Sequence, residues 1–215
     1  MVATNAVPNF IPSTRGLQFA NRFPPGPTVK LGPLDPRWIG IGDASSGLCG
    51  GMSWFVRERF DGDLPVPPDT EPPTNGSPLF AAIVRRQVRS LDWLRLPLRI
   101  WRMAATGAAR AARDTVDREW PRVRAEIDAG RPAMVALVRR TGWNPLALTM
   151  NHQVLAYAYD DGPEELVVRI YDPNWPRRDD VALRIRLGAG DGAPSPEGQS
   201  TGEPLAGFLA APYRG

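Results

Sequence analysis

The apolar pattern of this chain changes near residue 131, and that change limits the fold more than any other feature. Before it, apolar residues recur at helical spacing, as at Phe80, Val84 and Val88. After it come runs rich in valine and leucine and, over residues 181–187, a strict apolar and polar alternation. Helices followed by strands predict an α+β fold, with a mainly helical N-terminal half packed on an antiparallel sheet from the C-terminal half.

We expect one domain over residues 1–215, divided into three regions. Residues 1–36 are rich in proline and predict an extended arm, residues 49–130 are mainly helical, and residues 131–213 are mainly strands. Pro97 is expected to break or kink the helical region. The expected helices cover residues 49–60, 78–93, 98–113 and, with Pro121 in its first turn, a segment ending at Gly130. The expected strands cover residues 133–139, 152–159, 166–171, 181–187 and 205–213, with a surface loop over 188–204.

The composition excludes several classes of protein. A single cysteine forms neither an internal disulfide nor a cysteine-rich zinc site, and we expect no metal and no cofactor. The chain shows neither the pattern of a signal peptide nor a run of about 20 apolar residues, so we expect a soluble cytoplasmic protein. The formal net charge of +3 is modest, although Lys30 is the only lysine and the other basic residues are arginines.

The only cysteine and the only histidine each lie at the start of an expected element. Cys49 follows a glycine-containing turn and opens a helix, and His152 begins a strand. The next strand ends at Asp172, with Asn174 just beyond it. A helix N-terminus and a nearby imidazolium both lower the pKa of a thiol and so favour the reactive thiolate. We therefore interpret Cys49, His152 and Asp172 as candidate nucleophile, base and orienting carboxylate, with Asn174 as the alternative orienting group.

The local sequences around these residues resemble the papain-like cysteine peptidase superfamily. Cys49 opens a helix with Trp54 one turn later, as in the nucleophile helix of that superfamily. The sequence NHQV at residues 151–154 is similar to its histidine strand. The sequence YDP at 171–173, and IDAGRP at 127–132 before a valine-rich strand, are similar to a bacterial branch that includes the double-glycine-leader peptidases. The resemblance covers roughly residues 40–60 and 120–187.

This resemblance implies a papain-like fold and a thiol hydrolase that acts on a peptide or a related amide bond. Cys49 would attack the carbonyl carbon, His152 would carry the proton, and Asp172 would orient His152. The backbone N–H of Cys49 would form part of an oxyanion hole. Trp175 would shield the hydrogen bond between His152 and Asp172 from water. Gly50 and Gly51 are expected to leave the sulfur open to the backbone of a substrate.

One position departs from the superfamily pattern. A glutamine usually lies six residues before the cysteine and helps to hold the oxyanion, whereas this chain has Asp43 there. An ionised carboxylate would repel the developing charge, and the loss of one oxyanion donor lowers the rate by ~10²–10³. Either Asp43 lies elsewhere, or Gln18 or Ser46 supplies the donor, or the chain is a catalytically impaired papain-fold interaction module.

Each candidate residue also has a plainer interpretation. Cys49 would be a buried structural cysteine, His152 a histidine satisfied by its neighbours, and Asp172 a turn residue before Pro173. Transglutaminase-like proteins and arylamine acetyltransferases also use a cysteine, a histidine and an aspartate in this order. The local sequence here is closer to the papain-like peptidases.

A rival interpretation comes from the arginines between residues 85 and 113, a stretch in which Asp92 is the only acidic residue. Trp93 and Trp101 lie among them, and such a face suits a nucleic acid, an anionic membrane surface or another anionic partner. The alternative is a solvated helix face whose arginine stems cover apolar surface. The arginines are Arg85, Arg86, Arg89, Arg95, Arg99, Arg102, Arg110 and Arg113.

Overall fold

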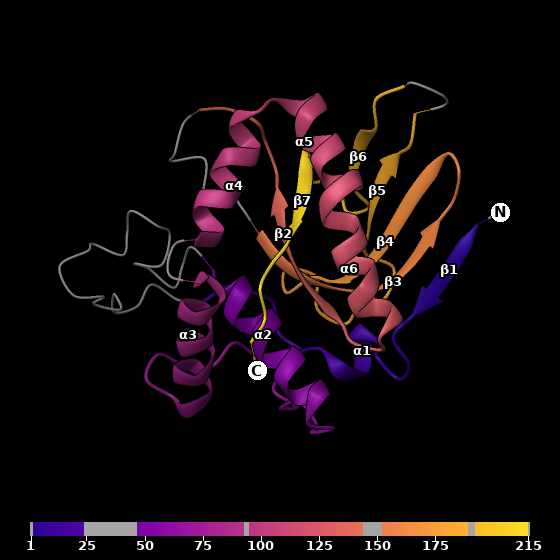
Figure 1. Ribbon diagram of the computed structural model, residues 1–215. Helices are drawn as coiled ribbons and strands as arrows, with labels where there is room; N and C mark the ends of the chain where they lie inside the picture. The colour runs from indigo at the N-terminus through magenta and orange to yellow at the C-terminus, as the bar shows by residue number, and fades with distance from the viewer. Residues whose placement is uncertain (1, 24–46, 93–94, 144–151, 189–191, 215) are drawn as a thin grey trace.

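The computed structural model describes residues 2–23, 47–92, 95–143, 152–188 and 192–214 (Figure 1). Asp43, Ser46 and Trp93, together with residues 24–36 of the expected arm, lie outside the described residues. The described chain contains helices and one curled antiparallel sheet (Figure 1), so the expectation of an α+β fold is confirmed.

Within the described residues, the sheet has seven strands, and every pairing in it is antiparallel. Its order is β6-β5-β4-β3-β2-β7, with β1 paired to the far half of β3. The strands are β1 (Ala3–Ala6), β2 (Ala133–Val138), β3 (His152–Asp161), β4 (Glu165–Tyr171), β5 (Ala182–Arg186), β6 (Ser195–Gln199) and β7 (Gly207–Ala210). All of β2 and most of β3 are buried, which explains the apolar runs over residues 133–138 and 154–159, whereas β4 alternates.

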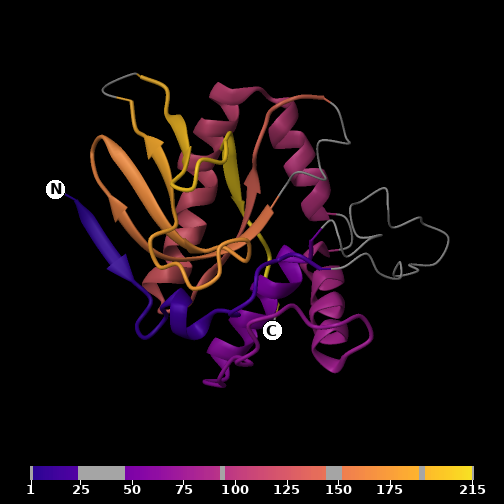
Figure 2. The same ribbon diagram turned by 180° about the vertical axis from the view of Figure 1, so that it is seen from behind.

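The helices lie on one face and at one end of this sheet (Figures 1 and 2). The elements are α1 (Pro12–Arg15), α2 (Cys49–Asp61), α3 (Pro78–Ser90), α4 (Arg95–Ala105), α5 (Ala108–Asp114), the π-helical turn η4 (Thr115–Glu119) and α6 (Trp120–Asp128). Helix α6 packs against β1, β2, β3 and β7, and α2 packs against α3 and β3. The core lies between these helices and the sheet and includes Met52, Ile83 and Leu155.

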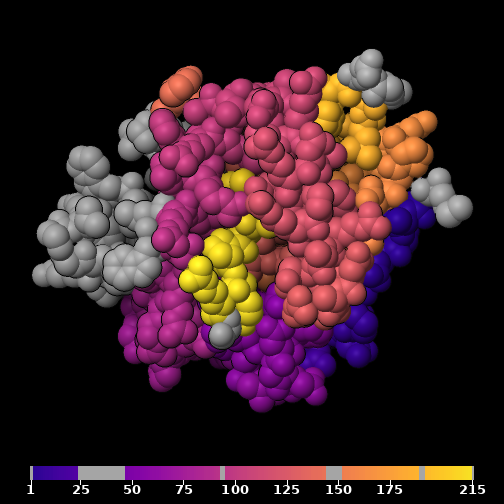
Figure 3. All heavy atoms as spheres, in the orientation of Figure 1, coloured from indigo at the N-terminus to yellow at the C-terminus, as the bar shows by residue number. Residues whose placement is uncertain are grey.

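The segment after β7 holds α2 in place. It crosses the surface between α2 and α6, where it appears in yellow in Figure 3. The ring of Tyr213 lies 4.8 Å from that of Trp54 and 4.5 Å from the guanidinium of Arg57. Arg57 is itself buried, pairs with Asp61 and Glu126, and donates to the carbonyl of Pro132. A buried arginine with these partners ties the helix that begins at the cysteine to the start of β2.

Two expectations about the helical region were wrong. Pro97 neither breaks nor kinks a helix, because it lies in the first turn of α4. The N–H groups of a first turn have no acceptor within the helix, so a proline there removes no helical hydrogen bond. The expected helix over 98–113 is divided instead at Gly107, whose φ of 84° is the left-handed conformation that favours glycine.

The arm and the loop over 188–204 were also predicted incompletely. The arm contributes β1 and α1, and the loop contains β6. Strand β6 escaped prediction because Pro196 and Gly198 interrupt its pattern. Both are tolerated because β6 is an edge strand and its pairing with β5 shifts register beside them.

The arginines of residues 85–113 do not all remain available. Arg86 pairs with Glu58, while Arg99 pairs with Glu119 and donates to the carbonyl of Ala210. Trp101 packs against Trp143, with ring centroids 6.1 Å apart. Part of the arginine face therefore holds the helices together. The exposed arginines are Arg85, Arg89, Arg95, Arg102, Arg110 and Arg113.

Two kinds of feature are absent from the described ranges. No helix there is both long and apolar enough to cross a membrane. Nor do those ranges contain a cluster of three or more histidine, cysteine, aspartate or glutamate side chains suited to a metal ion.

Candidate active site

The site begins at the N-terminus of α2, where Cys49 is the first helical residue and is partly exposed. Side chains from two other segments accept hydrogen bonds from the N–H groups around it. The amide oxygen of Asn21 accepts from Leu48 N at 2.6 Å, and that of Gln87 accepts from Gly51 N at 2.7 Å. Among the described residues, the N–H of Cys49 has no acceptor, as is usual for the first N–H groups of a helix.

The glycines after Cys49 serve a different purpose from the expected one. A Cβ on Gly51 would lie 2.2 Å from the carbonyl oxygen of Ile83, and one on Gly50 would lie 2.4 Å from Ser90 Oγ. The close approach that requires glycine is therefore made by α3 and, at Gly50, also by Gln153 of β3, so the expectation that these glycines open the sulfur to a substrate was wrong. They allow α2 to pack tightly enough to fix the position of Cys49.

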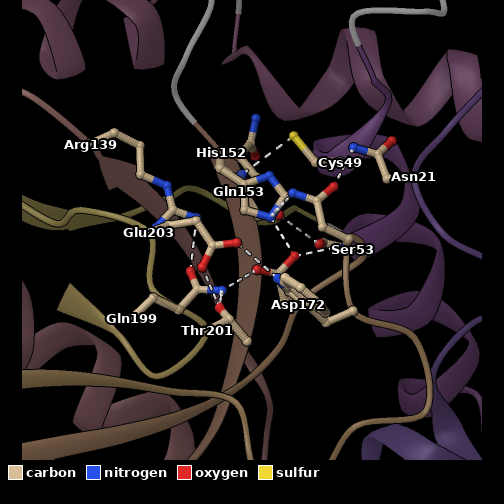
Figure 4. A network of polar contacts seen from close by, with 12 residues as sticks. Asn21, Cys49, Ser53, Arg139, His152, Gln153, Asp172, Gln199, Thr201 and Glu203 are labelled. Carbon is tan, nitrogen blue, oxygen red and sulfur yellow. Dashed lines mark hydrogen bonds and ion pairs between the residues drawn. The ribbon is translucent and has the colours of Figure 1, made fainter.

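His152 and Asp172 come from neighbouring antiparallel strands. His152 is the first residue of β3, and Asp172 follows the last residue of β4. The His152 Nε2 lies 2.6 Å from Asp172 Oδ1, and the two side chains are buried, with residue exposures of 6% and 1%. Next to the histidine, the backbone N–H of Gln153 donates to Cys49 Sγ at 3.4 Å (Figure 4). The fold thus brings all three candidate residues into one cluster.

The charges of the cluster shift the pKa values of the thiol and the imidazole in opposite directions. Burial by itself would raise the pKa of Cys49, but the charge and hydrogen bond of His152 and the N–H of Gln153 lower it below 9.0. Burial by itself would lower the pKa of His152, but Asp172 and the Cys49 thiolate raise it above 6.5. Both directions favour a thiolate and imidazolium pair over a neutral thiol and imidazole.

Asp172 makes a direct contact with the histidine ring. Burial would raise the pKa of its carboxyl, but His152, the N–H of Asn174 and the side chain of Gln199 together lower it. The N–H of Asn174 donates to Oδ1 at 2.8 Å. The Asn174 side chain is exposed, and its Nδ2 lies 3.4 Å from His152 Nε2. Asn174 therefore supports Asp172, which makes the shorter contact with the histidine.

The other candidates are placed as follows. One N–H of the Gln18 side-chain amide donates to Gly16 O at 2.6 Å, which holds this side chain in its own turn. Asp43 and Ser46 lie outside the described residues. The Trp175 indole N–H donates to Glu203 at 2.9 Å, and its ring lies 5.6 Å from the guanidinium of Arg178.

Sequence reasoning missed Asn21, which joins three segments at the site. Its backbone N–H donates to Pro173 O at 2.9 Å, its Oδ1 accepts from Leu48 N, and its Nδ2 donates to Asn174 Oδ1 at 3.1 Å. The turn before the cysteine and the turn after the aspartate are thus tied by one side chain. No pattern in the sequence marks Asn21, since its partners are distant along the chain.

Comparison of the chain with family models, with curated proteins and with solved structures finds no match. Function is therefore inferred from the contacts of the site.

Proposed function

We propose that this protein is a papain-like thiol hydrolase that cleaves a peptide bond or a related amide bond. The observation that carries the proposal is the His152 Nε2 to Asp172 Oδ1 contact of 2.6 Å beside a cysteine at a helix N-terminus. A structural cysteine needs neither a buried histidine nor a buried carboxylate beside it. The three groups support nucleophilic acyl chemistry because each adjusts the protonation of the next.

The proposed reaction begins with proton transfer from Cys49 to His152. Because Asp172 engages Nε2, Nδ1 is the ring nitrogen left to exchange a proton with the sulfur. The thiolate attacks the carbonyl carbon, and the C–N bond then breaks as the amine leaves with the proton from His152. A water molecule gives a proton to His152 and attacks the thioester, which releases the acid and restores the thiol.

The developing oxyanion needs donors at the N-terminus of α2. The N–H of Cys49 has no acceptor among the described residues, and it points from the positive end of the helix. These two properties suit a negative oxygen, and no cofactor is needed for the chemistry.

The main alternative is a papain-fold interaction module with impaired catalysis. The observation that favours it is the 2.6 Å hydrogen bond from the Gln18 amide to Gly16 O, which holds that side chain in its own turn and leaves at most one N–H for an oxyanion. Such a protein would keep a reactive Cys49 but turn over slowly. Anion binding through the exposed arginines is a further alternative, and binding that weakens steeply with added salt would support it.

The test is cleavage of a diverse peptide library by the wild type and by Cys49→Ala, with Ser195→Ala as a matched surface control. The proposal predicts cleavage by the wild type and by Ser195→Ala and none by Cys49→Ala, with all three folded by circular dichroism. Equal cleavage by Cys49→Ala would overturn it. Rapid alkylation of Cys49 with no cleavage would favour the interaction module.

A further inference from the structure

A chain of buried polar groups continues from Asp172 away from the cysteine. Gln199 Nε2 donates to Asp172 Oδ2 at 2.7 Å, and Arg139 Nη2 donates to Gln199 Oε1 at 2.8 Å (Figure 4). Gln199 and Arg139 are only 5% and 8% exposed. Gln199 ends β6, and Arg139 directly follows β2, so the curl of the sheet brings together the ends of two strands that are not neighbours.

The two neighbours of Gln199 permit only one orientation of its amide. A guanidinium has donors and no acceptor, and an ionised carboxylate has acceptors and no donor. The amide oxygen must therefore face Arg139, and the amide nitrogen must face Asp172. The second N–H of that nitrogen donates to Thr201 Oγ1 at 2.8 Å. Every polar atom of the Gln199 side chain is thus engaged.

Arg139 has partners of an unusual kind for a buried cation. The structure shows no direct ion pair between Arg139 and a carboxylate in the described part of the chain. Its guanidinium donates to Gln199 and, at 3.3 Å, to Pro204 O. An unpaired buried charge destabilises a fold. Burial lowers the pKa of the Arg139 guanidinium, and the nearby charges of Asp172, Glu203 and Cys49 oppose that effect. Gln199 joins Arg139 to Asp172 by hydrogen bonds, so its polarised amide lies between these two charges.

We propose that Gln199 is a positioning residue for the cluster of Cys49, His152 and Asp172, and that Arg139 fixes the orientation of its amide. With Oδ2 held by Gln199, the carboxylate does not rotate, and Oδ1 stays directed at His152 Nε2. The inference rests on the proposed function for its biological meaning. It also predicts the alkylation rate of Cys49 and the titration of His152, and both are measurable without a substrate.

The test uses Gln199→Glu, which keeps the size of the side chain and changes its charge. A protonated glutamic acid still donates to Asp172, whereas an ionised one repels it. We expect iodoacetamide to alkylate Cys49 at close to the wild-type rate at low pH. As the new carboxyl ionises, the rate should fall about tenfold below that of the wild type, the effect of losing one hydrogen bond to a charged group. The matched control Ser195→Glu adds the same charge at an exposed position of β6 and should keep the wild-type profile.

The only histidine gives a second readout, because its ring ¹⁵N signals belong to His152 alone. In Gln199→Glu these signals should show an additional titration that neither the wild type nor Ser195→Glu shows. Gln199→Met should slow alkylation at every pH and add no titration. A merely structural role for Gln199 would change stability and leave the pH profile as it is. Wild-type profiles in folded Gln199→Glu and Gln199→Met would overturn the proposal.

A measurement on the unsubstituted protein covers the case in which these variants do not fold. The side-chain amide protons of Gln199, assigned through bonds, should shift when His152 titrates, since their acceptor is its carboxylate partner. Signals that do not respond would contradict the proposal. Alkylation profiles as predicted, with no cleavage of any peptide, would instead reject only the proposed hydrolase. If cleavage depends on Cys49 but the Gln199 variants show the alkylation profile of the wild type, only this inference is rejected.

Discussion

His152 and Asp172 form a buried hydrogen bond of 2.6 Å between the start of β3 and the end of β4. Asp172 Oδ1 also accepts from the N–H of Asn174, and its Oδ2 accepts from Gln199. The carboxylate is therefore held on both oxygens, and its pKa lies below the ordinary value. A side chain held in this way is fixed in position beside the imidazole of His152.

The first prediction separates Asp172 from Asn174. Asp172→Ala removes the partner of His152 Nε2 and should lower the hydrolysis rate by about 10²–10⁴, the usual contribution of a positioned acid–base group. Asn174→Ala keeps the backbone N–H that donates to Asp172 and should lower the rate less than about tenfold. Steady-state rates of the two variants test this. The reverse order would assign the orienting role to Asn174.

The pH dependence of Cys49 alkylation follows from the directions of the pKa shifts. The thiolate forms above a pKa that lies below 9.0, and the imidazolium persists up to a pKa raised above 6.5. Alkylation should therefore rise with a midpoint below 9.0. Hydrolysis should be bell-shaped, with its alkaline limb set by loss of the His152 proton. His152→Ala removes the charge that lowers the thiol pKa, and its alkylation midpoint should move upward. An unmoved midpoint would contradict the ion pair.

The packing of α2 on α3 predicts a large effect of a single methyl group. Gly51→Ala would place a Cβ 2.2 Å from the Ile83 carbonyl oxygen, so the two helices must separate. We expect a loss of about 1–3 kcal/mol in the free energy of unfolding, together with slower alkylation of Cys49. Gly62→Ala, at the other end of α2, meets its neighbours at 3.4 Å and should change stability by less than about 0.5 kcal/mol. Urea denaturation measures the free energy of unfolding of both variants.

Asn21 should be coupled to Asn174 in a double-mutant cycle. Asn21→Ala removes the acceptor for Leu48 N and the donor to Asn174. We expect the free energy of unfolding to fall by about 1 kcal/mol. Because the two side chains are in contact, the effects of Asn21→Ala and Asn174→Ala on Cys49 alkylation should not add. Additive effects would show that the hydrogen bond between Asn21 and Asn174 does not influence Cys49.

The elements with long apolar patterns were predictable from sequence. The helix that opens at Cys49, the buried runs of β2 and β3 and the alternation of β5 all follow from local periodicity. Strand β6 was not predictable, because Pro196 and Gly198 disguise it and only its pairing with β5 makes it a strand.

The three candidate residues were visible in the sequence because each lies at the boundary of a regular element. Their supports were not visible. Asn21, Arg139 and Gln199 reach the site through the curl of the sheet and the path of the arm, which depend on contacts between residues far apart in the chain. Nothing in their local sequences distinguishes them from ordinary surface residues.

The most direct test of the account is the intact mass of the protein during turnover of a cleavable peptide. The account predicts a transient increase equal to the acyl part of the peptide, located at Cys49, absent from Cys49→Ala and lost as hydrolysis finishes. Cleavage without an adduct at Cys49, or equal cleavage by Cys49→Ala, would contradict it.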